Sequence, residues 1–406
     1  MTLNGVIDVS SIVDLSTEHQ SLLSRVGEVA RGCAERADEY DRTARFPAED
    51  FADLFAAGLH APTVPTEHGG LGVGPVRGDA LTLWLMTKEL AKADLSLGRC
   101  WEGHANSLLL IDALGAPEQQ ARWFAGVVER GEIWVGWSGE PQARKPGEKQ
   151  RFGTYVTRTD GGWILTGTKG FATSATGANW AILLVNTAGP GGARHADSGA
   201  DSLLMLACDL SDPTVTVDDT WWDPIGMRAT VSHLVKFDGT FLPDENVIGP
   251  PGAYVRDGWQ TAMIPHYAAS FLGAAEGAYE YAVEYVMRQG KGADPYVQQR
   301  VGSMAVNVES GHLWLRHIAR LWDTGRRDEA RLAGSRARHV VEHLALETVD
   351  HCIRACGARS LVRPSPVERI LRDLTFYVRH DNDDHVLATI GRALLGQTHD
   401  ASFYKP

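Results

Sequence analysis

The chain has 406 residues, of which 44% are hydrophobic and 22% are charged. This length and composition predict a folded protein whose large core divides into subdomains, and they exclude a largely disordered chain. The formal net charge of −12 argues against nucleic acid or an anionic membrane as the main partner. It does not exclude an anionic small molecule, because a local pocket can oppose the global sign.

Cysteine usage and the N-terminus bear on location. The five cysteines are scattered and odd in number, so we expect no disulfide framework and a cytoplasmic location. No basic segment followed by an apolar one begins the chain, and no run of about 18 apolar residues predicts a membrane span. Cys352 with Cys356, and His339 with His343, place metal-binding side chains one helical turn apart, but neither pair has a further ligand. We therefore expect no metal.

The first third of the chain predicts helices. Thr17 and Gln20 form a capping-box pattern ahead of apolar residues at helical spacing. A turn-rich loop over residues 62–72 interrupts the helical pattern. The later helices are expected over residues 48–57, 79–93 and 107–129, the last broken near Pro117. These segments predict a helical domain over residues 1–130.

From residue 131 the apolar period changes to that of strands. Short segments rich in β-branched and aromatic residues alternate with turn residues, and Asp160-Gly-Gly is a hairpin signal. This pattern predicts a compact antiparallel barrel or sandwich over residues 131–250. The expected strands begin near residues 133, 155, 163, 180, 202, 214 and 233.

After residue 250 the pattern is helical again to about residue 396. Residues 267–289 are rich in alanine and glycine at close spacing, which predicts helices packed tightly against each other. We expect residues 251–406 to pack with the first helical domain and the β-domain to lie beside them, as an α+β fold. The groove between them is the expected ligand site.

Four stretches of the chain resemble the acyl-CoA dehydrogenase superfamily, in the order and at the spacing of that family. The resemblance implies an N-terminal helical domain, a middle antiparallel β-domain and a C-terminal four-helix bundle. It also implies FAD as cofactor and an oxidoreductase that acts on a small molecule. The stretches are residues 64–72, residues 137–141 with 167–180, residues 223–232 with 242–249, and residues 366–373.

The resemblance further implies which residues hold FAD. Trp137, Ser138 and Gly139 are expected to run along the flavin edge. Phe171 stands where the family has a tryptophan on the flavin ring, and Thr173 stands where a hydroxyl meets flavin N5. Flat, mostly apolar walls with a few aimed donors suit an isoalloxazine. Without the resemblance, Phe171 and Thr173 also read as an ordinary strand pair in a domain core.

In the family, a neighbouring subunit helps to hold the adenine and pyrophosphate of FAD. Arg288 matches the arginine that does this, and Arg354 replaces a glutamine of the same region. The planar fork of an arginine also suits phosphate. Gly357-Ala358 replaces a Gly-Gly pair, which predicts a looser backbone approach. The resemblance therefore implies a homodimer or homotetramer, although both arginines also read as solvated surface charges.

The candidate catalytic residues lie at Asp381, His380 and His104. Asp381 stands where the family has a glutamate base, so a carboxylate is retained but is one methylene shorter. Such a base takes a proton from the α-carbon of an acyl thioester while the β-carbon passes hydride to the flavin. His380 beside it, and His104 on a helix, resemble the monooxygenase branch that uses reduced flavin. Asp381 also reads as a helix cap, and a lone histidine on a helix as structure.

Two departures weaken a plain acyl-CoA interpretation. Residues 142–148 replace the small residues that the family places near the pyrophosphate and the CoA chain, and Ile264 stands where an arginine that contacts CoA is expected. Our first hypothesis is an acyl thioester dehydrogenase with Asp381 as base and an electron-transfer flavoprotein as acceptor. The second is a monooxygenase served by a flavin reductase. The third is a non-catalytic relative.

Overall fold

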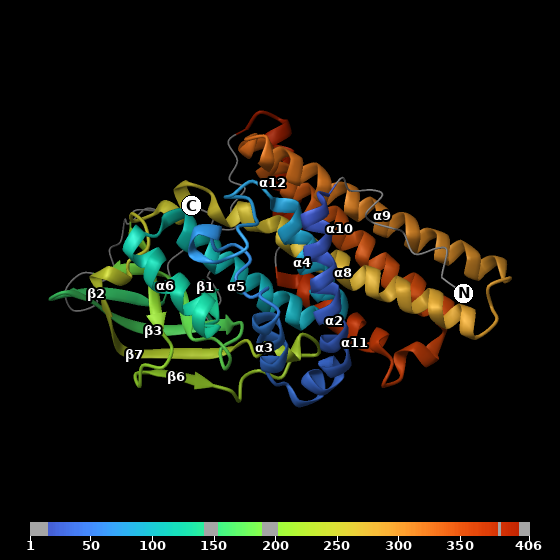
Figure 1. Ribbon diagram of the computed structural model, residues 1–406, viewed down its shortest axis with the longest axis horizontal. Coiled ribbons are helices and arrows are strands. Elements are labelled where there is room, and N and C mark those ends of the chain that lie inside the picture. The colour runs from blue at the N-terminus through green and yellow to red at the C-terminus, as the bar shows by residue number, and fades with distance from the viewer. Residues whose placement is uncertain (1–14, 142–152, 189–201, 381–382, 398–406) are drawn as a thin grey trace.

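The computed structural model describes residues 15–141, 153–188, 202–380 and 383–397. Helices come first, a seven-stranded sheet follows, and helices return, which confirms the predicted α+β order. Figure 1 shows the sheet at one end of the molecule and the long C-terminal helices at the other, with N-terminal helices against both. No helix in these ranges is long and apolar enough to cross a membrane.

The N-terminal helices begin at side-chain caps. Ser16 Oγ, and not Thr17, accepts the backbone N–H of His19, so the predicted capping box is wrong by one position. Asp94 accepts the N–H of Ser96, and α5 therefore begins well before the predicted residue 107. The elements are α2 (Thr17–Thr43), α3 (Ala48–Ala56), η1 (Thr66–His68), α4 (Ala80–Ala93), α5 (Leu95–Leu114) and α6 (Pro117–Arg130).

All seven predicted strands are present. The hairpin signal at Asp160 is confirmed, because β2 and β3 pair across a turn in which Gly161 has a φ of 71°. The strands are β1 (Trp134–Trp137), β2 (Tyr155–Thr159), β3 (Gly162–Ala172), β4 (Trp180–Ala188), β5 (Leu203–Asp209), β6 (Val215–Asp218) and β7 (His233–Pro243). They form one sheet with the order β1-β4-β2-β3-β7-β6, and β5 pairs with β4.

The sheet is not wholly antiparallel, which corrects the prediction. β1 pairs with β4 in parallel from Trp134 to Trp137, and β2 pairs with β4 in parallel from Tyr155 to Thr157. β5 pairs with β4 antiparallel along residues 203–209, so β1 and β2 share the other edge of β4. The apolar alternation of a strand fixes which face is buried, but it carries no information on the direction of the neighbour.

The C-terminal helices form a long bundle. α8, α9 and α10 run side by side, α12 packs against α10, and α4 packs against α8 from the other side (Figure 1). The elements are α7 (Ala253–Arg256), α8 (Trp259–Arg288), α9 (Pro295–Asp323), α10 (Arg327–Cys356), η6 (Ala358–Leu361), α11 (Pro366–Tyr377), η7 (Val378–His380) and α12 (Asp383–Leu394).

Two glycines allow α8 to approach α4 closely. A Cβ on Gly273 would collide with the carbonyl oxygen of Lys88 and lie 2.9 Å from the Cβ of Ala91. A Cβ on Gly277 would lie 3.0 Å from the carbonyl oxygen of Lys92. The tight packing that the alanine- and glycine-rich segment predicted is therefore confirmed.

Gly273→Val is expected to lower the free energy of unfolding by about 1–3 kcal/mol, because the added atoms overpack a filled helix contact. Urea denaturation followed by circular dichroism measures the change. Gly302→Ala is the matched control, because Gly302 lies in α9 with no atom within 4 Å of a new Cβ. It should raise stability by about 0.5–1 kcal/mol. Equal stability of Gly273→Val and the wild type would contradict the described packing.

A buried ionic cluster joins α4, α8 and α9. Glu276 accepts from Lys88 Nζ at 2.8 Å, from Lys92 Nζ at 3.0 Å and from His312 Nε2 at 3.1 Å. Burial alone would raise the pKa of Glu276, but Lys88, His312 and Lys92 hold it well below its usual range. Burial would likewise lower the pKa of Lys88, and Glu276 reverses that effect. Glu276 therefore keeps its charge in the core.

α11 is fixed to the loop between β6 and β7. Asp373 Oδ1 accepts the backbone N–H of Met227 at 2.5 Å, and a Cβ on Gly226 would collide with the carbonyl of Arg372. Arg372 Nη2 also pairs with Asp41 of α2 at 2.6 Å. Burial raises the pKa of Asp373 to about 7. Residues 223–232 and 366–373, two of the stretches that resemble the family, thus contact each other directly.

Candidate active site

A cavity of about 130 Å³ lies where α5 and α8 meet β1 and β4, between the helices and the sheet. Its position agrees with the groove that the order of elements predicted. Its apolar lining includes Leu110, Ile182, Leu184, Met205 and Met263. Its polar lining comprises Arg99, Asn106, Ser107, Ser138, Tyr254, Gln260, Tyr267 and His380. No acidic side chain is among the described residues that line it.

Arg99 is the cation of this cavity. Its Nη1 donates to Glu102 Oε1 at 3.2 Å, and its guanidinium lies 6.0 Å from the ring centroid of Tyr377. Glu102 is fully buried behind Arg99, where its other oxygen accepts from Tyr377 at 2.7 Å and from Ser270 at 3.2 Å. Burial raises the pKa of Glu102, and Arg99 opposes that rise. Within the described part of the chain, no hydrogen bond engages Arg99 Nε or Nη2.

Asn106 reaches the cavity from the next turns of α5. Its Oδ1 lies 2.8 Å from His266 Nδ1, and His266 Nε2 lies 2.7 Å from Thr87 Oγ1. Burial, followed by the charge of Arg99, lowers the pKa of His266 to about 3, so this histidine is neutral. The chain of polar groups fixes the Asn106 amide against α8 and α4. Sequence reasoning named neither Arg99 nor Asn106.

The structure brings His380 into the cavity. His380 ends η7, and its ring centroid lies 5.1 Å from that of Tyr267. The buried Arg338 of α10 donates to the carbonyl of Val378 at 3.1 Å and so anchors the same turn. Asp381, the predicted base, lies outside the described residues, directly after a residue that lines the cavity.

His104 does not reach the cavity, contrary to its predicted place. Its Nδ1 accepts the backbone N–H of Trp134 at 3.0 Å, so its Nε2 donates to the carbonyl of His60 at 2.8 Å. Burial, followed by His60, lowers the pKa of His104 well below its usual range. The neutral ring therefore ties α5 to β1. The neighbouring Gly103 is the residue of this turn that faces the cavity.

The three residues predicted along a flavin edge are the last residue of β1 and the two residues that follow it. Trp137 and Ser138 line the cavity, and Trp137 Nε1 donates to the carbonyl of Thr173 at 2.9 Å. Gly139 accepts the N–H of Gly170 at 3.1 Å, and a Cβ on Gly139 would lie 2.6 Å from the oxygen of Gly170. The ends of β1 and β3 thus approach so closely that this position requires glycine.

Phe171 and Thr173 lie at the end of β3, beside these residues. The Phe171 side chain is 56% exposed, and its φ of 53° is a conformation that side chains rarely adopt. Its ring contacts those of Trp221 and Trp222 at centroid distances of 5.1 and 6.0 Å. An exposed aromatic ring on a strained backbone position is unusual for a core strand pair.

A chain of hydroxyl groups lies behind Thr173. Thr173 Oγ1 is 3.1 Å from Ser232 Oγ, and Ser232 Oγ is 2.8 Å from Thr230 Oγ1. Thr230 Oγ1 donates to the carbonyl of Met227 at 2.8 Å. All three hydroxyl residues are buried. They connect the end of β3 to the turn between β6 and β7.

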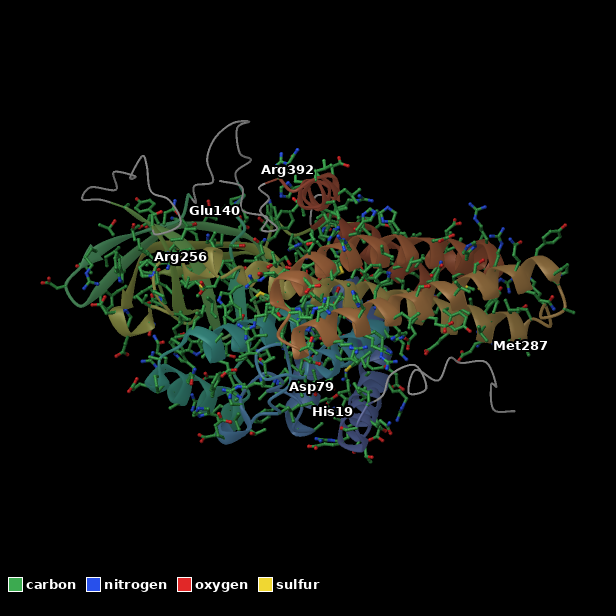
Figure 2. All side chains as sticks on the ribbon, turned by 90° about the horizontal axis from the view of Figure 1, so that it is seen from above. His19, Asp79, Glu140, Arg256, Met287 and Arg392 are labelled. Carbon is green, nitrogen blue, oxygen red and sulfur yellow. The ribbon has the colours of Figure 1, made fainter. Side chains whose placement is uncertain are left out.

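The remaining predicted cofactor residues lie far from this site in the same chain. Arg288 ends α8, and Arg354 and Gly357 end α10. Figure 2 shows Met287, which precedes Arg288, at the end of the bundle that points away from the sheet. Glu140, which follows Gly139, lies at the sheet. Arg354 pairs with Asp350 at 2.6 Å. One chain therefore does not bring these three residues together with Trp137 and Thr173.

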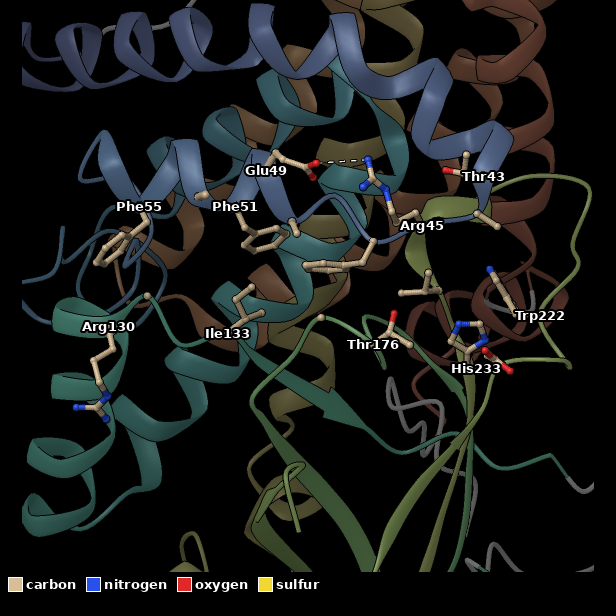
Figure 3. Close-up of a pocket in the computed structure, with 18 residues that line it drawn as sticks. Thr43, Arg45, Glu49, Phe51, Phe55, Arg130, Ile133, Thr176, Trp222 and His233 are labelled. Carbon is tan, nitrogen blue, oxygen red and sulfur yellow. Dashed lines mark ion pairs between the residues drawn. The ribbon is translucent and has the colours of Figure 1, made fainter. Parts of the chain in front are cut away.

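A second and larger groove, of about 1030 Å³, lies between α3 and the β-domain (Figure 3). Phe51 and Ile133 line one part of it, and His233 lines another. Its charged residues Arg45 and Glu49 pair with each other at 3.3 Å. No motif in the sequence indicated this groove, because its walls come from separate segments.

Known proteins resemble this chain along most of its length. The sequence profiles of the acyl-CoA dehydrogenase N-terminal and C-terminal domains match residues 16–131 and 266–383. YdbM of Bacillus subtilis (strain 168), named provisionally as an acyl-CoA dehydrogenase, is 29% identical over 377 residues, which cover 88% of this chain and 92% of YdbM. Dibenzothiophene monooxygenase of Mycolicibacterium goodii is 26% identical over 413 residues, which cover 94% of this chain and 95% of that protein.

Solved structures share the fold. TdsC from Paenibacillus sp. A11-2, in a complex with FMN and indole, has a TM-score of 0.83 at 23% identity. The match covers 95% of this chain and 100% of TdsC. At this identity the likeness shows the architecture alone.

Proposed function

The chain belongs to the acyl-CoA dehydrogenase family, and we propose that within it the protein is a flavin-dependent monooxygenase for a compact, polar substrate. Its cofactor is FAD, as the family resemblance implies. The polar side chains that line the cavity, among them Ser138 and His380, are the observation that supports a monooxygenase over a dehydrogenase.

The residues present fit a flavin. Phe171 offers an exposed ring, Gly139 and Gly170 bring two strand ends together, and Thr173 adds a hydroxyl beside them. Flat apolar walls with few polar groups suit an isoalloxazine. When bound in reduced form, the flavin supplies the electrons for oxygen activation, so that one oxygen atom enters the substrate and the other leaves as water.

The polar lining disfavours a saturated acyl chain. Such a chain would strip water from Arg99 and Asn106 without replacing their hydrogen bonds. Each uncompensated polar group costs about 1–3 kcal/mol. A substrate that carries an oxygen-rich or anionic group would satisfy the same donors. Arg99 would bind that group, and Asn106, held by His266, would orient it.

His380 would manage protons in this reaction. It lines the cavity beside Tyr267, and its turn is anchored by Arg338. The apolar lining residues and Trp137 would exclude water from the cavity. His104 has no role at the reacting atoms in this proposal, because both its ring nitrogens are engaged.

A second candidate is the dehydrogenation of an acyl thioester with Asp381 as base. The observation that favours it is the position of His380, which lines the cavity and directly precedes Asp381. A carboxylate in register with the family base would thus follow the cavity wall. The accepting partner would be an electron-transfer flavoprotein, whereas the monooxygenase would need a flavin reductase.

We expect label from ¹⁸O₂ to enter indole or indole-2-carboxylate when either is mixed with the FAD-loaded protein that has been reduced without air. Mass spectrometry measures the incorporation. Oxidised protein mixed with butyryl-CoA or glutaryl-CoA under anaerobic conditions should keep its flavin absorbance. Bleaching by a thioester together with no label in any indole would overturn the monooxygenase proposal in favour of dehydrogenation. A colourless protein that takes up no FAD would point to a non-catalytic relative.

The positions of the remaining predicted cofactor residues support the association of two or more copies of the chain. Arg288, Arg354 and Gly357 would meet the FAD phosphates of a neighbouring copy, in a homodimer or homotetramer. Guanidinium groups bind phosphate well. The length of α8 supports this proposal, because Arg288 ends this helix about 30 Å along its axis from Tyr267, which lines the cavity.

A further inference from the structure

In the chain of hydroxyl groups behind Thr173, the donor and the acceptor of each hydrogen bond can be assigned in only one way. A serine or threonine hydroxyl has a single proton to donate. Thr230 gives its proton to the carbonyl of Met227, which accepts only. Ser232 must therefore donate to Thr230 across their 2.8 Å contact, since two oxygens at that distance need a proton between them.

The same reasoning fixes Thr173. Ser232 has used its proton toward Thr230, so Thr173 must donate to Ser232 across 3.1 Å. The Thr173 oxygen is left with lone pairs alone for any further partner. Whatever atom lies against it must carry a proton, or Thr173 must give up its bond to Ser232.

We propose that Ser232 and Thr230 hold Thr173 as a hydrogen-bond acceptor, and that the site consequently prefers reduced over oxidised flavin. This inference rests on the proposed flavin function and on the family resemblance, which implies that the Thr173 hydroxyl meets flavin N5. N5 carries a proton only in reduced flavin, whereas in oxidised flavin it is itself an acceptor. Ser232 and Thr230 are positioning residues, because they act through Thr173 without touching the flavin.

The consequence is a raised midpoint potential for the bound flavin. A site that binds the reduced form more tightly makes reduction easier, and for a two-electron couple each tenfold preference corresponds to about 30 mV. Such a preference suits a protein that receives its flavin in reduced form. It does not depend on the identity of the substrate.

Three isosteric or near-isosteric variants test the direction of the chain. In Ser232→Ala, Thr173 loses its acceptor and can donate to oxidised flavin. In Thr230→Val, Ser232 is freed to donate to Thr173, which can then donate to the flavin. In Thr173→Val, neither redox form gains a bond. The wild type is therefore expected to have the highest potential and all three variants a lower one, because a freed Thr173 hydroxyl bonds both redox forms and a valine bonds neither.

The measurement is the midpoint potential of each FAD-loaded protein, obtained by spectrophotometric titration with redox dyes. The drop from wild type to each variant should correspond to about a three- to tenfold change in the ratio of the two affinities, as expected for one hydrogen bond. Thr240→Val is the control, because the buried Thr240 hydroxyl pairs with that of Thr214 at 2.7 Å near the far end of β7. Its potential should match that of the wild type.

The outcomes separate the two proposals. Unchanged potentials in all three variants, with FAD still bound, would show that Thr173 does not face the flavin and would overturn the placement itself. A raised potential in Thr173→Val would show that Thr173 donates in the wild type, which would overturn the direction proposed here while leaving the flavin site intact. Potentials of Ser232→Ala and Thr230→Val equal to that of the wild type, with a lowered potential in Thr173→Val, would show that these two residues do not hold Thr173 as an acceptor.

Discussion

Arg99→Met is expected to erase the preference of the cavity for an anionic ligand. The wild type should bind indole-2-carboxylate about ten- to a hundredfold more tightly than indole, because a hydrogen bond to a charged group is worth about 1.5–3 kcal/mol. Arg99 is the one arginine or lysine among the described residues of the cavity, so methionine removes the fixed positive charge that favours the carboxylate. Titration of the bound-flavin absorbance with each compound measures both affinities.

Glu102 supplies the complementary variant. Glu102→Gln removes the negative charge behind Arg99 while keeping the contacts to Tyr377 and Ser270, so the anionic preference should increase. Arg122→Met, at an exposed pair with Glu245, is the control and should leave both affinities unchanged. An anionic preference that survives Arg99→Met would mean that another group binds the carboxylate.

Glu276→Leu should strongly destabilise the helical core, by about 3–5 kcal/mol, because it removes the buried carboxylate that Lys88, Lys92 and His312 share and leaves Lys88 paired with Glu89 alone. Lys88 is 2% exposed and has Glu276 at 2.8 Å, while Lys92 and His312 contact the same carboxylate. Chemical denaturation at pH 7 measures the loss. Lys88→Met combined with Glu276→Leu is the control, since replacing both members of a buried pair by apolar residues is often neutral.

The same cluster gives a pH dependence with a definite sign. The folded pKa of Glu276 lies below its unfolded value of 4.5, so its contribution is fully present above about pH 4.5. That contribution is lost as the pH falls toward the folded pKa. The stability difference between wild type and Glu276→Leu should therefore shrink below pH 4.5. A difference that stays constant down to pH 3 would contradict the lowered pKa.

The strands and most helices could be predicted because their apolar periods are local. The direction of β1 against β4 could not, since alternation within a strand does not depend on its neighbour. α5 was placed too late for a different reason. Most of its residues are buried on every side, so it lacks the apolar stripe by which a surface helix is recognised. The cap at Asp94 was the available signal.

The site shows the same limit on a finer scale. His104 was chosen as a cavity residue, but one position on a helix turns a side chain by about 100°. Arg99, Gly103 and Asn106 are spaced four and three residues apart and share the face toward the cavity. A charged residue and an amide seven residues apart, on one face of a mostly buried helix, were the signal that would have found them. Asp381 stays a prediction.

The packing of α4 against α8 has a consequence for how the chain folds. The two helices meet at Gly273 and Glu276, although well over a hundred residues and the whole sheet separate them in sequence. During synthesis the first helices would emerge before α8, so that one apolar face and the side chains of Lys88 and Lys92 would not yet have their partners on α8. A fragment that ends before α8 should therefore expose that face and aggregate, so the three segments of the sequence are not three independent folding units.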